Sequence, residues 1–309
     1  MIELLKNKGV IVESLNYGQF PLHVGISAWR DRVVIELPSG KTVQDRDLRS
    51  VLYRREASPT PSPSIQDAKI QEYIVRESEN LLESLPYTLR TAWVSNPEAV
   101  KIAARKPFHL HRAADIGFQI PKTLFTNSPR QARDFVTSLG KSIAIKTLWT
   151  PGITVMEGEN EQPIALYTRK LEPNQILPDI SRVQNCPMIF QEYVEKKFEL
   201  RVTIVGPQVF ACAIWSQASP HTQEDWRRYD LQNTPHEPHQ LPAKLEDLCR
   251  SLIQNLGLQF GCIDMIVTPQ GEYIFLELNP NGQWLWIEQL TKMPISETLA
   301  QMLMYPLAN

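Results

Sequence analysis

The hydrophobic and polar positions of the first 95 residues predict a small mixed unit of short strands and one long helix. Apolar residues gather at 10–14 and 32–38, which we expect to be strands, and again at 48–56. Small hydroxyl residues alternate with prolines over residues 58–64, which excludes a helix or central strand there and predicts a loop. Between Gln66 and Leu85, apolar residues recur every three or four positions, which predicts a helix that packs by one face.

The pattern changes near Ser95, and we expect a domain boundary there, between residues 1–94 and 95–309. Asn96, Pro97 and Glu98 supply a helix N-cap, a proline in the first turn and an acid beside it. Beyond this point we expect a strand at residues 120–126, a helix at 128–139 that Gly140 ends, and a second strand at 141–148. Helices and strands therefore alternate in this part of the chain.

Strands dominate from Ile164 onward. They are expected at residues 163–170, 187–194, 199–206, 208–216, 261–268 and 272–280. Gly206-Pro207 and residues 269–271 form the predicted hairpin turns, with one helix over 242–257 and a mostly helical end over 284–304. The expected fold class is α/β (α+β), with a central lobe of about residues 95–190 and a C-terminal lobe of about 191–309.

Composition narrows the class of protein. Hydrophobic residues make up 42% and charged residues 21%, as in ordinary globular chains, and 32 Lys and Arg against 34 Asp and Glu argue against a general nucleic-acid binder. No apolar run has the length of a membrane span, and the first residues lack a signal-peptide core. We therefore expect a cytoplasmic protein with no membrane partner. The four cysteines are too far apart to suggest a disulfide framework or a zinc site.

A predicted hairpin near the end of the chain carries the strongest chemical signal. Asp264, Glu277 and Asn279 lie among its apolar residues, and strand periodicity places the last two on one face. If residues 269–270 form the turn, Asp264 lies opposite Phe275 and shares that face as a diagonal neighbour of Glu277. Three oxygen donors then converge. A hard cation such as Mg²⁺ would compensate their burial, and a salt bridge to Lys or Arg is the alternative.

Two lysines are candidates for holding phosphate. Lys146 ends an apolar strand and lies on the face opposite Ile143 and Ile145, where an ammonium is either a phosphate ligand or a side chain that extends to solvent. Lys106 precedes Pro107, the expected first residue of a helix, where an anion would also meet free backbone N–H groups. The chain has no G-x-x-x-x-G-K-[ST] loop, so any nucleotide must be held by other means.

Other polar residues carry weaker signals. Glu199 and Arg201 share one strand face, where an ordinary ion pair between them is the simpler interpretation. His236 and His239 are spaced like metal ligands, but the proline between them favours a surface loop. A second pair, His109 and His111, is expected to face solvent.

Taken in chain order, these residues resemble the ATP-grasp fold. The order matches that of the fold: first come a lysine before a helix and a lysine on a strand, then a Gln-Glu-x-Val hinge and a strand glutamate, and last Asp and Glu-x-Asn on a hairpin. The chain is most similar to the ATP-grasp peptide ligases that mature microviridin-type ribosomal peptides, the graspetides. The similarity extends from about Asn96 to the C terminus and is densest over residues 187–206 and 261–288, with Asp-Trp-Arg at 225–227.

The resemblance implies a role for each matched residue. ATP phosphates would be held by Lys106 and Lys146, the adenine by Gln191, Glu192, Tyr193 and Val194, the ribose by Glu199, and Mg²⁺, as two ions, by Asp264, Glu277 and Asn279. Arg201 and Arg227 would be catalytic and stabilise an acyl phosphate and its transition state. The segment 148–160 would form a lid over the site.

The implied function is that of an ATP-dependent macrocyclase. It would activate Asp or Glu side chains of a ribosomally made precursor peptide as acyl phosphates and form ω-ester or ω-amide crosslinks with Ser, Thr or Lys side chains. The partner is the precursor with its leader, and a homodimer is one option for the assembly. Two alternatives stay open: a small-molecule or protein-tail ligase of the glutathione synthase or glutamate ligase type, and a non-catalytic peptide-binding relative.

The N-terminal end departs from the family pattern. These ligases begin with a short apolar strand before a helix, whereas this chain starts with residues typical of a helix end. We expect the first strand of a small pre-ATP-grasp α/β domain to be missing, either because the reading frame starts late or because the domain is abbreviated. Tyr53, Arg54 and Arg55 are similar to an arginine-bearing motif near the end of the family's first domain, although they could also be a basic strand end.

Overall fold

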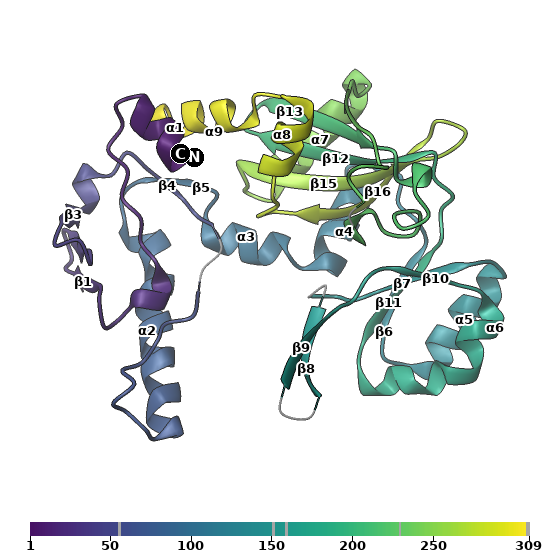
Figure 1. Ribbon diagram of the computed structural model, residues 1–309, viewed down its shortest axis with the longest axis horizontal. Helices are drawn as coiled ribbons and strands as arrows, with labels where there is room; N and C mark the ends of the chain where they lie inside the picture. The colour runs from purple at the N-terminus through teal and green to yellow at the C-terminus, as the bar shows by residue number, and fades with distance from the viewer. Residues whose placement is uncertain (55–56, 150–151, 158–159, 229, 307–309) are drawn as a thin grey trace.

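The computed structural model describes residues 1–54, 57–149, 152–157, 160–228 and 230–306. Figure 1 shows three groups of elements: the N-terminal residues on the left, a lobe with a four-stranded sheet at the lower right, and a lobe with a five-stranded sheet above it. No helix in the described residues is both long enough and apolar enough to cross a membrane.

The N-terminal group is built on one long helix and two small sheets. Its helices are α1 (Ile2–Asn7) and α2 (Ala68–Thr88), and its strands are β1 (Gly25–Ala28), β2 (Val33–Glu36), β3 (Thr42–Gln44), β4 (Ser50–Leu52) and β5 (Ala92–Val94). The predicted helix is confirmed as α2, which begins where the Asp67 carboxylate accepts hydrogen bonds from the N–H groups of Lys69 and Ile70. The predicted loop at 58–64 contains no helix or extended strand.

The strand predicted at residues 10–14 is wrong. This segment has no regular structure, although its side chains do alternate: Val10 and Val12 pack against the C-terminal helices, and Ile11 is 87% exposed. Alternation fixed which side chains are buried, but a strand also needs a partner backbone, and this segment pairs with none. The apolar side chains of residues 10–14 are therefore packed, but their backbone joins no β-sheet.

The central lobe is an antiparallel sheet with helices on one face. Its strand order is β10-β7-β11-β6, with β6 (Thr123–Thr126), β7 (Ile143–Lys146), β10 (Arg169–Leu171) and β11 (Met188–Glu192). Helices α5 (Pro129–Leu139) and α6 (Pro173–Ile176) pack on that sheet through one shared apolar cluster (Figure 1). As predicted, α5 ends at Gly140, whose φ of 61° is left-handed and suits a residue without a Cβ.

A separate hairpin extends from the central lobe. It consists of β8 (Gly152–Glu157) and β9 (Asn160–Ala165), which pair with each other alone among the described strands. The single strand predicted over 163–170 is thus wrong, because the chain leaves this hairpin at Ala165 and enters the main sheet only at Arg169. Residues 150–151 and 158–159 of the predicted lid lie outside the described residues.

The C-terminal lobe is a five-stranded antiparallel sheet buried on both faces. Its order is β14-β13-β12-β15-β16, with β12 (Phe198–Val205), β13 (Gln208–Ile214), β14 (His236–His239), β15 (Phe260–Val267) and β16 (Tyr273–Asn279). Helices α3 (Pro97–Ala103), α4 (Lys106–Asp115) and α7 (Ala243–Asn255) pack with one face. The other face is covered by α8 (Leu285–Thr291) and α9 (Ile295–Met304).

Strand periodicity explains this double burial. Along β13, Ala211 and Ala213 belong to the cluster with α7, whereas Cys212 and Ile214 belong to the cluster with α9. The prediction that His236 and His239 lie in a surface loop is wrong, since they are the ends of the edge strand β14. Proline can occupy an edge strand because one side of that strand needs no donor.

Phe275 offers a test of the packing between α4 and the sheet. Its ring is fully buried and lies 6.2 Å from the ring of His109 on α4 and 5.1 Å from that of Phe118, which follows the helix. We expect Phe275→Ala to lower the free energy of unfolding by about 3–5 kcal/mol, because the cavity left behind cannot close completely. Urea denaturation measures this loss. Trp149→Ala removes a side chain that is 88% exposed and should change stability by less than about 0.5 kcal/mol.

Candidate functional site

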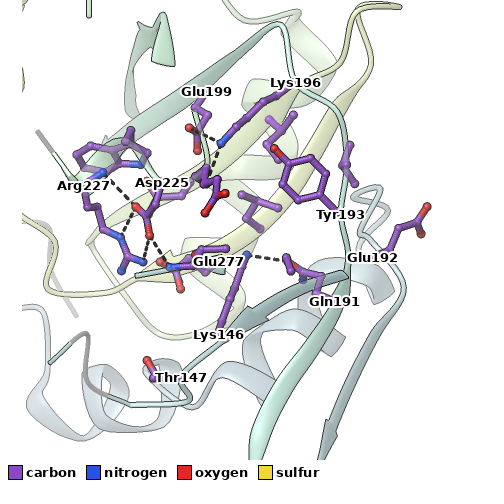
Figure 2. A pocket seen from close by; sticks show the side chains of 18 of the residues that line it. Lys146, Thr147, Gln191, Glu192, Tyr193, Lys196, Glu199, Asp225, Arg227 and Glu277 are labelled. Carbon is purple, nitrogen blue, oxygen red and sulfur yellow. Dashed lines mark hydrogen bonds and ion pairs between the residues drawn. The ribbon is translucent and has the colours of Figure 1, made fainter. Parts of the chain in front are cut away.

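One cleft collects most of the residues singled out in the sequence. It lies between the central sheet and the C-terminal sheet (Figures 1 and 2). Its wall includes Lys106, Lys146, Gln191, Glu192, Tyr193, Val194, Glu199, Arg227, Asp264 and Glu277. Asn279 and Arg201 join this set through direct contacts with Asp264. Segments as much as 170 residues apart in sequence therefore meet at one place.

The carboxylates converge as predicted, but through a different register. Asp264 pairs directly with Glu277, and Met265 pairs with Phe275, so a β-bulge at this point leaves Leu276 without an opposite residue. The prediction that Asp264 lies opposite Phe275 is wrong by two residues, because the strands already pair one residue further along at Met265 and Phe275 and the bulge adds the second. The bulge keeps Asp264 and Glu277 on the same face and brings them closer than the diagonal pair that we expected.

Lysines hold Glu277 in its charged form. Lys106 Nζ lies 3.1 Å from a Glu277 oxygen. Burial would raise the pKa of Glu277, but the positive charges of Lys106, Lys146 and Arg227 outweigh it and lower the pKa. The salt bridge that the sequence left as an alternative is thus formed, between Glu277 and Lys106.

Asp264 is held by a buried arginine. One terminal nitrogen of Arg201 donates to both Asp264 oxygens at 2.8 Å. Burial, together with the charge of Glu277, raises the pKa of Asp264 to about 6, although Arg201 opposes that shift. The predicted ion pair between Arg201 and Glu199 is not formed; each of the two side chains has its own partner.

The donor set fits a magnesium ion. The Asn279 side-chain nitrogen lies 2.7 Å from Asp264 and 3.5 Å from Glu277, so the amide lies between both carboxylates. Turning that amide over would present a third oxygen to the same point, and oxygen ligands are what Mg²⁺ prefers. The described residues contain no cluster of three His, Cys, Asp or Glu side chains placed to hold a metal, so the amide is needed to complete this set.

Lys146 and Lys106 enter the cleft from different lobes. Lys146, at the end of β7, donates to Gln191 at 2.7 Å (Figure 2). Gln191 in turn donates to Thr123 at 2.9 Å. Burial lowers the pKa of Lys146 to about 8. Lys106 also donates to the Thr147 carbonyl at 3.1 Å. The positive charges of both lysines act on Glu277 and lower its pKa.

His109 fixes the helix that carries Lys106, and the prediction that it faces solvent is wrong. The side chain is 1% exposed. Its Nδ1 pairs with the Ala103 carbonyl at 2.9 Å, and its Nε2 accepts from the Leu278 N–H at 3.3 Å. Burial lowers its pKa, which matches the neutral tautomer that these two contacts require. The histidine thus joins the start of α4 to β16, beside Glu277.

The hinge after β11 forms the opposite wall. The Glu192 carboxylate points away from the cleft (Figure 2) and pairs with Lys141. Tyr193 and Val194 line the cleft, and burial raises the pKa of Tyr193 to about 12. Glu199 is paired with Lys196 at 2.8 Å in a contact buried from solvent. Lys196 was not predicted as a site residue, because its place in a charged turn between strands is also typical of surface lysines.

Arg227 is fixed by an acid two residues before it. Its Nε donates to Asp225 at 2.8 Å, and a second nitrogen contacts the other oxygen (Figure 2). Asp225 is 4% exposed and also accepts from the backbone of Thr168, in the central lobe, at 2.9 Å. Our assignment overlooked Asp225, although the Asp-Trp-Arg sequence itself offered the signal. Trp226 packs on Trp286, with ring centres 5.0 Å apart.

Comparisons with known proteins agree with this geometry. A sequence profile of the RimK-like ATP-grasp domain matches residues 99–303. A search of curated protein sequences finds no match. Solved structures, in contrast, match over nearly the whole chain, including the residues that precede that domain.

Two solved structures illustrate the likeness. A Chryseobacterium gregarium RiPP-associated ATP-grasp ligase, in complex with ADP and a leader and core peptide, is 29% identical at a TM-score of 0.88 and covers 99% of this chain and 92% of its own. Macrocyclase MdnC from Microcystis aeruginosa, bound with precursor peptide MdnA, is 28% identical at a TM-score of 0.85. The match covers 98% of this chain and 94% of the MdnC chain. D-cycloserine synthetase DcsG, at 14% identity and a TM-score of 0.59, shares the fold alone.

The pKa of Lys146 leads to a pH prediction for nucleotide binding. A phosphate anion favours the charged lysine and raises its pKa above the value of about 8 in the free protein. ADP affinity should therefore be full below pH 8 and fall by up to about tenfold per pH unit above it, until the pKa of the complex is reached. Calorimetry from pH 7 to 9.5 measures this fall.

Two variants give the prediction its control. Lys146→Arg keeps the charge but does not titrate in this range, so its ADP affinity should no longer fall with pH. Lys244→Arg changes an exposed lysine on α7 and should leave the pH profile as it is. An unchanged profile in Lys146→Arg would show that another group controls binding.

Proposed function

This chain belongs to the RimK-like ATP-grasp family and has the mixed α/β ATP-grasp fold, and we propose that it is an ATP-dependent peptide ligase that crosslinks a ribosomally made precursor peptide. One observation carries the proposal. Relatives whose structures contain leader, core or precursor peptides match 98–99% of this chain, well beyond the nucleotide-binding domain itself.

ATP and Mg²⁺ are the expected cofactors. Lys106 and Lys146 would bind the phosphates, and the hinge from Gln191 to Val194 would flank the adenine, with Glu199 at the ribose. For the ribose to bind, Glu199 must share its carboxylate between Lys196 and the ribose hydroxyls. Asp264, Glu277 and Asn279 would hold two magnesium ions, which supply positive charge that offsets the triphosphate.

The chemistry follows from charge and position. An oxygen of a peptide Asp or Glu carboxylate attacks the γ-phosphorus, ADP leaves, and an acyl phosphate forms. A Ser, Thr or Lys side chain then attacks the acyl carbon, loses its proton, and displaces phosphate. Arg227, held by Asp225, and Arg201 would stabilise the negative charge that develops on the phosphoryl and acyl oxygens. A planar guanidinium with a fixed partner suits that role.

The geometry also bears on the two alternatives. A non-catalytic relative has no need for two lysines and three oxygen donors gathered in one cleft, so their convergence favours an enzyme. A ligase of the glutathione synthase or glutamate ligase type would share this nucleotide site. Full-length likeness to peptide-bound ligases favours the peptide substrate.

We further propose a cytoplasmic location, no nucleic-acid partner, domains at residues 1–94 and 95–309, and a homodimer as an option.

Mass spectrometry tests the proposal directly. The protein is incubated with ATP, Mg²⁺ and a precursor that carries its leader and is rich in Asp, Glu, Ser and Thr. We expect the peptide to lose one water for each ring and one ADP to be released for each water lost. ADP release stimulated by free amino acids without peptide would support the small-molecule alternative instead. An unchanged peptide mass without ADP release would contradict ligase activity.

Arg227 and its neighbour allow a matched comparison. Arg228 is equally positive but pairs with Glu224 at the surface. We expect Arg227→Met to lower kcat by about 10²–10³-fold with little change in the KM for ATP, because the charge that it stabilises is greatest in the transition state. Arg228→Met should retain activity. Steady-state ADP release measures both, and an equal effect of the two variants would remove Arg227 from the catalytic set.

A further inference from the structure

We propose that Arg54 is a positioning residue for the metal site, acting from the N-terminal part of the chain; this inference rests on the proposed function. Arg54 follows β4 and lies outside residues 99–303, which match the family profile. Both of its terminal nitrogens donate to the Gly282 carbonyl at 3.2 Å. Arg54 therefore crosses from the first part of the chain to the turn that follows β16.

The surface beneath Arg54 is fixed. Its guanidinium lies 4.7 Å above the ring of Trp284 and 5.6 Å from that of Phe260. Trp284 is itself oriented by a hydrogen bond from its Nε1 to Ser296 on α9, at 3.0 Å. A flat cation against two adjacent rings, whose centres are 5.3 Å apart, with two donors aimed at one carbonyl, has little freedom to move. Lysine could supply the charge and one donor but not the planar contact.

The turn held by Arg54 packs directly on Arg201. The N–H of Gly282 donates to the Asn279 carbonyl at 3.1 Å, which closes the turn. A Cβ at Gly282 would lie 2.7 Å from an Arg201 nitrogen and 2.6 Å from Cys262 Sγ, so only glycine lets the backbone come this close. The next carbonyl, that of Gln283, accepts from Arg201 at 3.4 Å.

Arg201 depends on that turn because it has few other contacts. Its Nε is buried and has no hydrogen-bond partner among the described residues. The guanidinium is thus positioned by Asp264 on one side and by the turn on the other. Asn279, at the start of the same turn, donates to Asp264. A shift of the turn would displace Arg201, Asp264 and Asn279 together.

Positioning of this kind should alter metal binding more than nucleotide binding. Residues that orient metal ligands commonly change metal affinity by about 10–100-fold when replaced. Arg54 contacts the turn after β16 at Gly282 and the rings of Trp284 and Phe260, and none of these three residues lines the nucleotide cleft. Its loss should therefore reduce the increase in ADP affinity that Mg²⁺ provides and leave ADP affinity without Mg²⁺ unchanged.

Calorimetric titration of ADP, with EDTA and again with saturating Mg²⁺, tests the inference on the full chain without any peptide. We expect Arg54→Met to reduce the Mg²⁺-dependent gain in ADP affinity about tenfold, and Arg54→Lys to reduce it by less. Arg49→Met is the matched control: Arg49 also reaches across to a carbonyl, that of Met304 at 3.2 Å, but at the end of α9. It should keep the full gain.

Three results would overturn the inference. The first is a Mg²⁺-dependent gain in ADP affinity in Arg54→Met that equals the wild-type gain, and the second is an equal loss of that gain in Arg54→Met and Arg49→Met. The third is a wild-type protein whose ADP affinity does not change with Mg²⁺. If Arg54→Met does not fold, Arg54→Lys decides alone, and a wild-type gain in that variant would overturn it. Failure to crosslink any precursor would remove the peptide-ligase proposal without changing this result, since only ADP and Mg²⁺ are bound.

Discussion

The active cleft depends on compensating two carboxylates that lie opposite each other on neighbouring strands. Asp264 and Glu277 pair directly across β15 and β16, where like charges repel and burial raises the cost of each. Arg201 from β12 stabilises one, and Lys106 from the start of α4 stabilises the other. The charges therefore fix how α4, β12 and the hairpin meet.

The two lobes share the remaining parts of the site. The central lobe contributes Lys146 and Gln191, and the C-terminal lobe contributes the carboxylates and Arg227. Asp225 joins them, since it holds Arg227 in one lobe and the Thr168 backbone in the other. A cleft built between two sheets can bring an anionic phosphate and an anionic carboxylate together only because cations reach it from both sides. Arg54, from the N-terminal part of the chain, holds the turn after β16 through the Gly282 carbonyl and so positions the site from outside both lobes.

Local pattern predicted most elements but not their pairing. The Asp67 cap of α2, the Gly140 end of α5 and the alternation along β12 and β13 each depend on a few neighbouring residues, so the sequence could reveal them. The β15–β16 register could not be predicted in the same way, because neither a turn that is one residue longer nor a one-residue bulge leaves a mark in the apolar pattern. His109 looked like a surface residue for a similar reason: its burial is caused by β16, about 170 positions away.

The sequence by itself determined which residue types carry chemistry and in what order they follow one another: two lysines, a hinge, an acid, an arginine pair and three oxygen donors. Tertiary structure decided which of them are partners. It assigned Arg201 to Asp264 and Lys196 to Glu199, turned the Glu192 carboxylate outward to Lys141, and revealed Asp225 as the anchor of Arg227. The physical reason is that charge is a property of a single residue, whereas pairing depends on distance and burial, which only the folded chain sets.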